Sequence, residues 1–281
     1  MDNEIASKIE KIELTLMQDD ILGFDPTVLS VLDNIEIGRA EIEDLKSRLG
    51  AHIFSHLFNI ANSAYHGSLK LGPVQHFFDV VNRIGTQHTK ALIILFVANR
   101  LARGDQDAEI IFAKNFAASV VGRIMARGLG FRDDSAQKVE LACLLSSIGA
   151  LMMTAYRNHY ATGDFVVSDD FIEQNHRYLT ERIIRRFQLP EYLAEMIMTD
   201  CLILERMGIG LPTVVKLAIA FVDWSFRTMD NKFVFRTPQA TLDDKSTPSL
   251  ASIIEEQFLA AGMKKYLIIL PETTCTPPQG N

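Results

Sequence analysis

The sequence has 281 residues, of which 48% are hydrophobic, and a formal net charge of −7 at pH 7. A chain of this length and composition can bury one large core or two modest ones without disulfides or a structural metal. The acidic balance argues against nucleic-acid binding, because phosphate contacts require a basic surface. The densest basic cluster is Arg182, Arg185 and Arg186, and with Glu181 and Glu195 nearby we interpret it as a solvated surface.

The cysteines and the N-terminus indicate the compartment. Cys143, Cys201 and Cys275 are widely separated and lack Cys-x-x-Cys spacing, so neither a disulfide framework nor a zinc site is expected. With an acidic N-terminus that lacks an apolar signal segment, this usage predicts a cytoplasmic protein. The longest apolar runs, 91–98 and 141–155, fall short of the roughly 20 residues that span a bilayer. We therefore expect no membrane insertion, and we also expect no cofactor and no bound metal.

Helical periodicity dominates the chain up to about residue 230. The first predicted helix carries Ile5, Ile9, Ile12 and Leu16 on one stripe and packs either on the body of the protein or on a second copy. A second begins after Asp25. Apolar spacing and glycine or proline stops predict further helices over 39–49, 52–64, 74–84, 87–101, 112–127, 135–156, 171–186, 191–207 and 212–229, with a polar loop over 103–107.

The last fifty residues differ in character. Residues 233–235 and 266–270 are rich in aromatic and β-branched side chains and predict two short strands, with a helix over 249–261 between them. Residues 236–248 are a predicted linker and 273–281 a disordered tail. The predicted organisation is an N-terminal helix over 1–18, a helical domain over 19–230 with parts 19–110 and 111–230, and a C-terminal extension over 231–281.

Four blocks of distinctive residues follow one another along the chain. They are LFNIANSAYHG at 57–67, FDVVNRIG at 78–85, a stretch ending in LLSSIG at 144–149, and Glu173-x-x-His176 followed by FQLP at 187–190. In this order they resemble the HDOD family, HD-related output domains of bacterial signalling, over roughly residues 20 to 230. The resemblance implies an all-α fold, an HD-like helical bundle, here with the small C-terminal appendage.

The resemblance also implies that the metal site of HD hydrolases has been lost. Ser146 and Ser147 stand where the His-Asp pair is expected, Lys114 stands near the first His, and Ile219 stands where a late Asp would be. A serine hydroxyl is a poor metal ligand unless it is deprotonated. Asp223, one turn beyond Ile219, would be a lone carboxylate under a shifted alignment. Where some members of the family carry a His-His pair, this chain has Thr199 and Asp200.

Several polar residues have two interpretations. Asn62, Ser63 and Tyr65 belong to the first block and either contact a ligand or partner or satisfy local backbone groups. Glu173 and His176 are either a relic ligand pair or an ion pair or hydrogen bond.

The two serines and a pair of histidines also have two interpretations. Ser146 and Ser147 are expected to bond the carbonyl one turn back and to let helices pack closely, since nucleophilic chemistry would need a positioned base. His52 and His56 share a helical face, but the sequence offers no third ligand for zinc.

These observations predict a non-catalytic bacterial signal-transduction module that binds signalling proteins through a degenerate HD-like cleft. The alternatives are a small-molecule or nucleotide sensor that uses the same cleft and a divergent metal-dependent phosphohydrolase. A weak homodimer is also expected, formed through the N-terminal apolar stripe or through the strand at 266–270.

Overall fold

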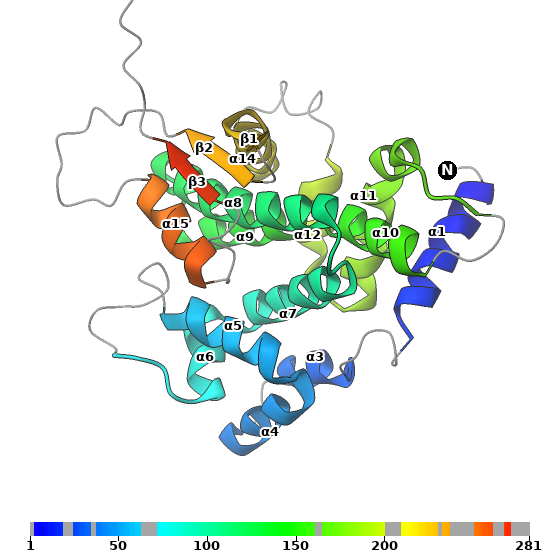
Figure 1. Ribbon diagram of the computed structural model, residues 1–281. Coiled ribbons are helices and arrows are strands. Elements are labelled where there is room, and N and C mark those ends of the chain that lie inside the picture. The colour runs from blue at the N-terminus through cyan, green and yellow to red at the C-terminus, as the bar shows by residue number, and fades with distance from the viewer. Residues whose placement is uncertain are drawn as a thin grey trace, which may run out of the picture.

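The computed structural model describes residues 3–18, 25–34, 38–62, 72–160, 165–199, 209–229, 232–236, 250–260 and 267–270. This part of the chain is mainly helical, which confirms the predicted all-α class (Figure 1). The helices of the first half are α1 (Asn3–Leu16), α3 (Thr27–Leu32), α4 (Arg39–Leu49), α5 (Ala51–Asn62), α6 (Phe77–Ile84) and α7 (Thr86–Leu101). Those of the second half are α8 (Gln106–Gly128), α9 (Asp133–Leu145), α10 (Ile148–His159), α11 (Asp169–Arg186), α12 (Glu191–Met198), α14 (Leu211–Ser225) and α15 (Leu250–Ala260).

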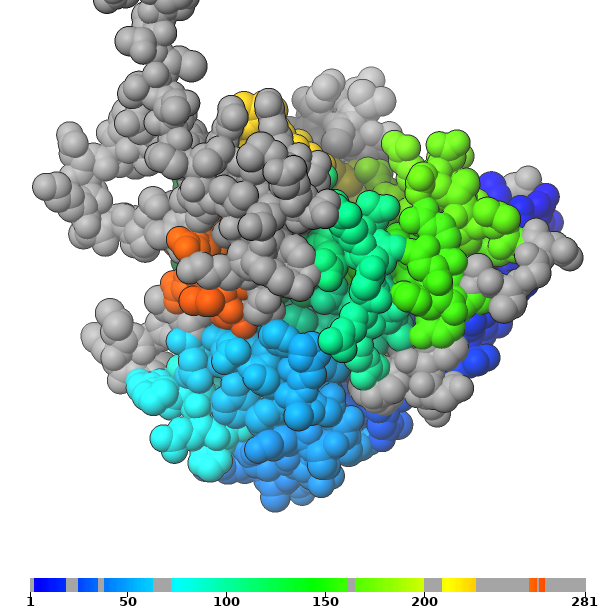
Figure 2. Space-filling model, viewed as in Figure 1, coloured from blue at the N-terminus to red at the C-terminus, as the bar shows by residue number. Residues whose placement is uncertain are grey.

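Helix α7 is the central element of the fold. Every residue from His88 to Ala98 is buried, as expected of a helix that is apolar on all sides. It packs against α3, α5 and α6 on one side and against α8, α9 and α10 on the other. Figure 2 shows the blue and cyan atoms of α3–α6 gathered into one lobe below the green atoms of the second half.

The second half is held together by a close junction of α8, α9 and α14. Gly122 of α8 lies at this junction. A Cβ atom on it would lie 2.8 Å from Cys143 Sγ and 3.0 Å from Val139 Cγ1 on α9, and 3.5 Å from the Cβ of Ala218 on α14. The absence of a side chain at residue 122 therefore lets three core helices approach each other.

The N-terminal helix α1 packs on the body of its own chain. It contacts α10 and α11, and Ile9, Ile12 and Leu16 are fully buried there. Between them Glu13 is also buried, and its carboxylate accepts hydrogen bonds from Arg182 and Arg186 of α11.

Arg182 and Arg186 remain partly exposed, as expected of a solvated surface, but both also donate to one buried carboxylate, that of Glu13. Their acceptor lies 169 and 173 residues away in sequence, where no local charge pattern reveals it. Arg185 pairs with Glu181, as the local spacing suggests.

A small sheet and one helix form the C-terminal part of the fold. Its strands are β1 (Phe226–Met229), β2 (Lys232–Arg236) and β3 (Leu267–Leu270), in the order β1-β2-β3. β1 pairs with β2 antiparallel, and β2 pairs with β3 in parallel. The strands β2 and β3 lie at the two predicted positions. β1 was predicted as the end of a helix over 212–229, but α14 stops at Ser225 and the next four residues pair with β2.

Other helix boundaries also differ from the prediction. The helix predicted over 135–156 is two helices, because Ser147 has φ −119° and ψ 23° and lies outside the helical region. The apolar pattern runs through this break and therefore does not reveal it. α8 begins inside the predicted loop, at Gln106, where Asp105 caps it by accepting from the Ala108 N–H. α6 begins at Phe77 rather than at Val74.

Some predictions fall outside the described residues. These are the end of the helix predicted over 191–207, most of the linker at 236–248 and the tail at 273–281. The proposed domain boundaries remain predictions.

Within the described part of the chain, one stretch is long and apolar enough by composition to cross a membrane, residues 133–159. This differs from the expectation that all apolar runs are too short. The stretch comprises α9 and α10, and 94% of its most apolar window is buried inside the protein. The stretch is therefore part of the buried core of the helical bundle.

Candidate functional site

The two serines at the expected His-Asp position form the turn between α9 and α10. Ser146 is 6% exposed, and its Oγ donates to the Cys143 carbonyl at 2.9 Å and lies 3.4 Å from Asn115 Oδ1 of α8. Ser147 takes the N-cap position of α10 but makes no side-chain capping bond. The Ser146 hydroxyl is therefore bonded to its own helix end inside the core.

The other positions compared with lost metal ligands lie on α8 and α14. Lys114 Nζ donates to Asp223 Oδ1 at 2.7 Å, with 37% and 53% of the two side chains exposed. Ile219 is half-buried one turn before Asp223. The structure thus joins Lys114 to the one carboxylate that could have replaced the late Asp, and this carboxylate is part of an ion pair.

Asn62 and Thr199 bond backbone groups. Asn62 Oδ1 accepts from the Val74 N–H at 2.6 Å, and its Nδ2 donates to the Val74 carbonyl at 3.4 Å. These two bonds tie the end of α5 to the segment before α6. Thr199 ends α12, and its Oγ1 donates to the carbonyl of Glu195 one turn back. Three further predicted site residues, Ser63, Tyr65 and Asp200, lie outside the described residues.

The predicted pair Glu173 and His176 lies on α11. Glu173 is exposed, whereas His176 is mostly buried, and its Nδ1 has no hydrogen-bond partner in the described structure. Burial, with smaller effects of Arg177 and Lys216, lowers the pKa of His176 to about 4. The imidazole is therefore neutral at pH 7, and within the described residues no bond joins it to Glu173.

His52 and His56 lie side by side on α5, with ring centroids 4.4 Å apart in an edge-to-face arrangement. His56 also stacks on Phe96 of α7, at 4.9 Å between centroids, and lies close to the backbone of Ala260 in α15. Burial and the proximity of His52 lower the pKa of His56. Among the residues that the structure describes, no three His, Cys, Asp or Glu side chains are grouped so that they could hold a metal ion.

Sequence reasoning missed a buried lysine between the two halves of the molecule. Lys90 of α7 is fully buried, and its Nζ lies 2.6 Å from Asp33 Oδ2 at the end of α3 and 3.4 Å from the Gln188 carbonyl after α11. Gln188 has φ 51°, the one positive φ of a non-glycine residue in the described chain. Gln188 belongs to the FQLP block. This block indicates a turn in the sequence, but it does not indicate that Lys90 is buried beside that turn.

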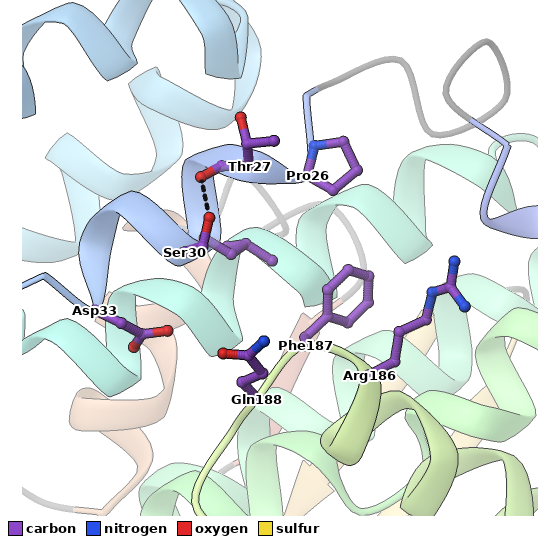
Figure 3. A pocket seen from close by; sticks show the side chains of 8 residues that line it. Pro26, Thr27, Ser30, Asp33, Arg186, Phe187 and Gln188 are labelled. Atoms are coloured by element: carbon purple, nitrogen blue, oxygen red, sulfur yellow. Dashed lines mark hydrogen bonds between the residues drawn. The ribbon is translucent and has the colours of Figure 1, made fainter.

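A cavity of about 230 Å³ lies between α3 and the turn after α11, and its lining includes Asp33 and Gln188, the two residues that Lys90 contacts. Figure 3 shows Ser30 and Asp33 on α3 facing Phe187 and Gln188 of the turn. Pro26, Thr27, Leu29 and Arg186 complete its lining. None of its lining residues is a position compared with the lost metal ligands, so this pocket is separate from the cleft that the sequence suggested.

A second buried charged group lies between α7, α8 and α9. Arg123 NH1 is 2.9 Å from Glu140 Oε2, and His88 Nε2 is 3.4 Å from the same oxygen. All three residues are buried, with at most 9% of each exposed. Because an unpaired buried charge is costly, these contacts fix how the three helices meet.

An apolar stripe lies on the outer face of α14. It consists of Leu217, Phe221 and Trp224, which follow one another at helical spacing. Leu217 is 49% exposed and Trp224, the one tryptophan of the chain, is 71% exposed. The rings of Phe221 and Trp224 lie 6.3 Å apart. Asp223 lies beside this α14 stripe. The stripe therefore borders the carboxylate that could have replaced the late Asp of the HD metal site.

Comparison with solved structures shows the fold to which this arrangement belongs. A protein of Shewanella amazonensis SB2B, named as a candidate metal-dependent phosphohydrolase, has a TM-score of 0.55 at 13% identity and covers 92% of this chain and 100% of its own. A second candidate phosphohydrolase of that organism has a TM-score of 0.49 at 16% identity, with 93% and 89% coverage. An HDOD domain protein of unknown function from Geobacter sulfurreducens has a TM-score of 0.47 at 14% identity, with 89% and 91% coverage.

Comparison with protein families gives the assignment. No curated protein matches the sequence. The model of the HDOD domain family matches residues 27–200, which is more than half of the 281 residues. The matched range contains the four blocks of the sequence, the two serines and the buried lysine. The chain therefore belongs to the HDOD family.

Proposed function

We propose that this HDOD chain is a non-catalytic module of bacterial signal transduction that acts by binding other proteins. The observation that carries the proposal is the Ser146 hydroxyl, which is buried and bonded to the Cys143 carbonyl at 2.9 Å. Metal-dependent hydrolysis needs a ligand at this position that is free to bind the ion and to hold an activated water. A hydroxyl bonded inside the core serves packing instead.

The pairing of Lys114 with Asp223 supports the same conclusion. The ammonium group is 2.7 Å from the carboxylate, and a cation at this distance occupies the charge that would otherwise attract a divalent metal. The two positions thus form a surface ion pair. The chemistry that remains around them is better suited to contact with another macromolecule.

The α14 stripe is the surface that best fits protein binding. Exposed apolar patches rimmed by polar residues mark interaction sites, and tryptophan is enriched at the centres of interfaces. Trp224 is 71% exposed, and the Lys114–Asp223 pair supplies a polar rim. Burial of such a ring against a partner would remove a large apolar area from water.

The catalytic half of the proposal is tested with phosphoester substrates. Wild-type protein and the Ser146→Ala/Ser147→Ala variant are compared in Mn²⁺, in Mg²⁺ and after treatment with EDTA. We expect equal background rates in every condition. Metal-dependent cleavage by the wild type that the double substitution abolishes would overturn the proposal.

The binding half is tested by affinity capture from the source cells with three forms of the full chain. We expect wild type and Leu129→Ala to retain the same specific proteins and Trp224→Ala to lose them. Leu129 is a matched control because it is also exposed, at 48%, but lies at the far end of α8. Retention that does not change with Trp224→Ala would exclude the α14 stripe as the interface.

A second candidate function rests on the cavity between α3 and the turn after α11. Its volume of about 230 Å³ and its mixed lining of Asp33, Arg186, Gln188 and Phe187 suit a small polar ligand. A nucleotide panel tests this, because a ligand at 100 times its Kd stabilises the folded state by about 2.7 kcal/mol. A melting temperature that rises in wild type but not in Asp33→Asn would support a sensor, and no rise across the panel would exclude it for these compounds.

A further inference from the structure

Helix α15 lies between the two halves of the molecule. It contacts α5 of the first half, α8 of the second and the strand β3 that follows it, and Figure 2 shows its orange atoms directly against the blue atoms of α5. Ile254 and Phe258, four residues apart, are 0% and 1% exposed, whereas Leu259 is 56% exposed. α15 therefore places one apolar side in a groove between α5 and α8 and presents the other side to solvent.

The groove also contacts the end of the helix. His56 of α5 lies close to the backbone of Ala260 at that end. The imidazole is held in place by stacking on Phe96. Hydrophobic grooves of proteins bind amphipathic helices by receiving their apolar face.

The helical form of α15 depends on this groove. It has 11 residues, and isolated helices of this length are marginal in water because nucleation is costly. The chain joins it to β2 through residues 237–249 and to β3 through residues 261–266. A short amphipathic helix on connections of this length can leave its groove without a change in the core helices α7 to α11.

We propose that α15 is a displaceable ligand of the groove between α5 and α8, and that a partner protein binds there with an amphipathic helix of the same kind. The occupant seen in the structure defines that partner, which carries an aliphatic residue and a phenylalanine four positions apart, as Ile254 and Phe258 are in α15. This inference rests on the proposed function only in assigning the groove to protein binding. The displacement itself does not depend on it.

The experiment uses the full chain and a fluorescein-labelled peptide of residues 249–262. In wild type the tethered helix competes at an effective concentration in the millimolar range, so the peptide binds weakly. We expect Phe258→Ala, which weakens the tethered helix, to bind the peptide at least tenfold more tightly than wild type does. Leu259→Ala, its exposed neighbour, is the matched control and should behave as wild type. Equal affinity for wild type and Phe258→Ala would overturn the proposal.

A measurement without substitution covers the case in which Phe258→Ala fails to fold. Hydrogen exchange of the wild-type chain should show the amides of α15 exchanging at least tenfold faster than those of α8, because local opening exposes them. Protection of α15 equal to that of α8 would also overturn the proposal. If the peptide and exchange experiments fail, the phosphoester and Trp224 results are unaffected. Metal-dependent hydrolysis would instead overturn the proposed function and leave the peptide result unaffected.

Discussion

The backbone N–H of Gly149 donates to the Thr180 hydroxyl at 3.0 Å and thereby joins the first turn of α10 to the middle of α11. Both residues are buried. A Cβ atom on Gly149 would lie 2.0 Å from the His176 carbonyl oxygen and 2.8 Å from the Thr180 backbone nitrogen. The glycine of the LLSSIG block is thus explained by a helix crossing that leaves no room for a side chain.

Gly149→Ala is expected to destabilise the protein strongly. The atoms that the new methyl group would meet belong to the backbone of α11, so a helix must move, and overpacking of this kind costs about 1–3 kcal/mol or more. Urea denaturation measures the change. Gly128→Ala is the control, because nothing lies within 4 Å of its Cβ position and alanine is favoured over glycine in helices. A neutral effect of Gly149→Ala would show that the crossing is looser than described.

Thr180→Val removes the hydroxyl that caps α10 from the neighbouring helix. Thr180 is fully buried, and Ser147 makes no capping bond of its own, so the Gly149 N–H would lose its partner. A buried donor without an acceptor costs about 1–3 kcal/mol. Thr180→Ser keeps the hydroxyl and should retain most of the stability in the same denaturation assay. No loss of stability in Thr180→Val would show that the hydroxyl does not stabilise this crossing.

The helical fold could be predicted from the sequence because helical periodicity is a local signal. Ile9, Ile12 and Leu16 lie within two turns of each other, and all are buried as predicted. The break at Ser147 could not be predicted, since Leu145 and Ile148 on either side keep the pattern apolar. The break is decided by the backbone geometry of Ser147 and by the packing of α9 and α10 on different helices.

For the buried Lys90 and its partner Asp33, we expect removal of one charge to destabilise the protein more than removal of both. Asp33→Asn leaves the Lys90 ammonium buried with only the Gln188 carbonyl near it, and loss of one partner from such a pair costs about 3 kcal/mol. Replacement of both groups removes the buried charge. We therefore expect Lys90→Met/Asp33→Asn to be more stable than Asp33→Asn alone in thermal denaturation. A double variant less stable than the single one would mean that the lysine has another function.

The stability of the protein is expected to fall between pH 6.5 and pH 4. The pKa of His176 is lowered from 6.5 to about 4 by burial, so the folded state holds the imidazole neutral while the unfolded state binds a proton. The stabilisation is complete above pH 6.5 and is lost as the pH falls toward the folded pKa, up to about 3 kcal/mol. Denaturation of His176→Gln over this range should show a smaller loss. His56, whose pKa is also lowered by burial and by His52, adds to the loss in the same direction.

The site was harder to predict than the fold because its contacts connect distant parts of the chain. Lys90 and Asp33 are 57 residues apart, and Lys114 and Asp223 are 109 apart. No local pattern relates such pairs. The family resemblance located the two serines, but only the structure shows that the Ser146 hydroxyl is bonded to the Cys143 carbonyl.

The carboxylate of Glu13 should stabilise the docking of α1. It is 5% exposed and accepts from both Arg182 and Arg186, and Glu13→Gln removes the charge while it keeps the shape. Because the arginines are partly exposed and water can solvate them, we expect a loss of about 1–3 kcal/mol, below that of a fully buried pair.

Glu10→Gln provides the control for this prediction. Glu10 is exposed on the same helix, and its substitution should change stability by less than about 0.5 kcal/mol. Urea denaturation compares the two variants, and limited proteolysis reports on α1 directly. We expect faster cleavage near Met17 in Glu13→Gln than in Glu10→Gln, because the apolar stripe alone then holds the helix. Equal cleavage rates would show that Ile9, Ile12 and Leu16 are sufficient to dock α1.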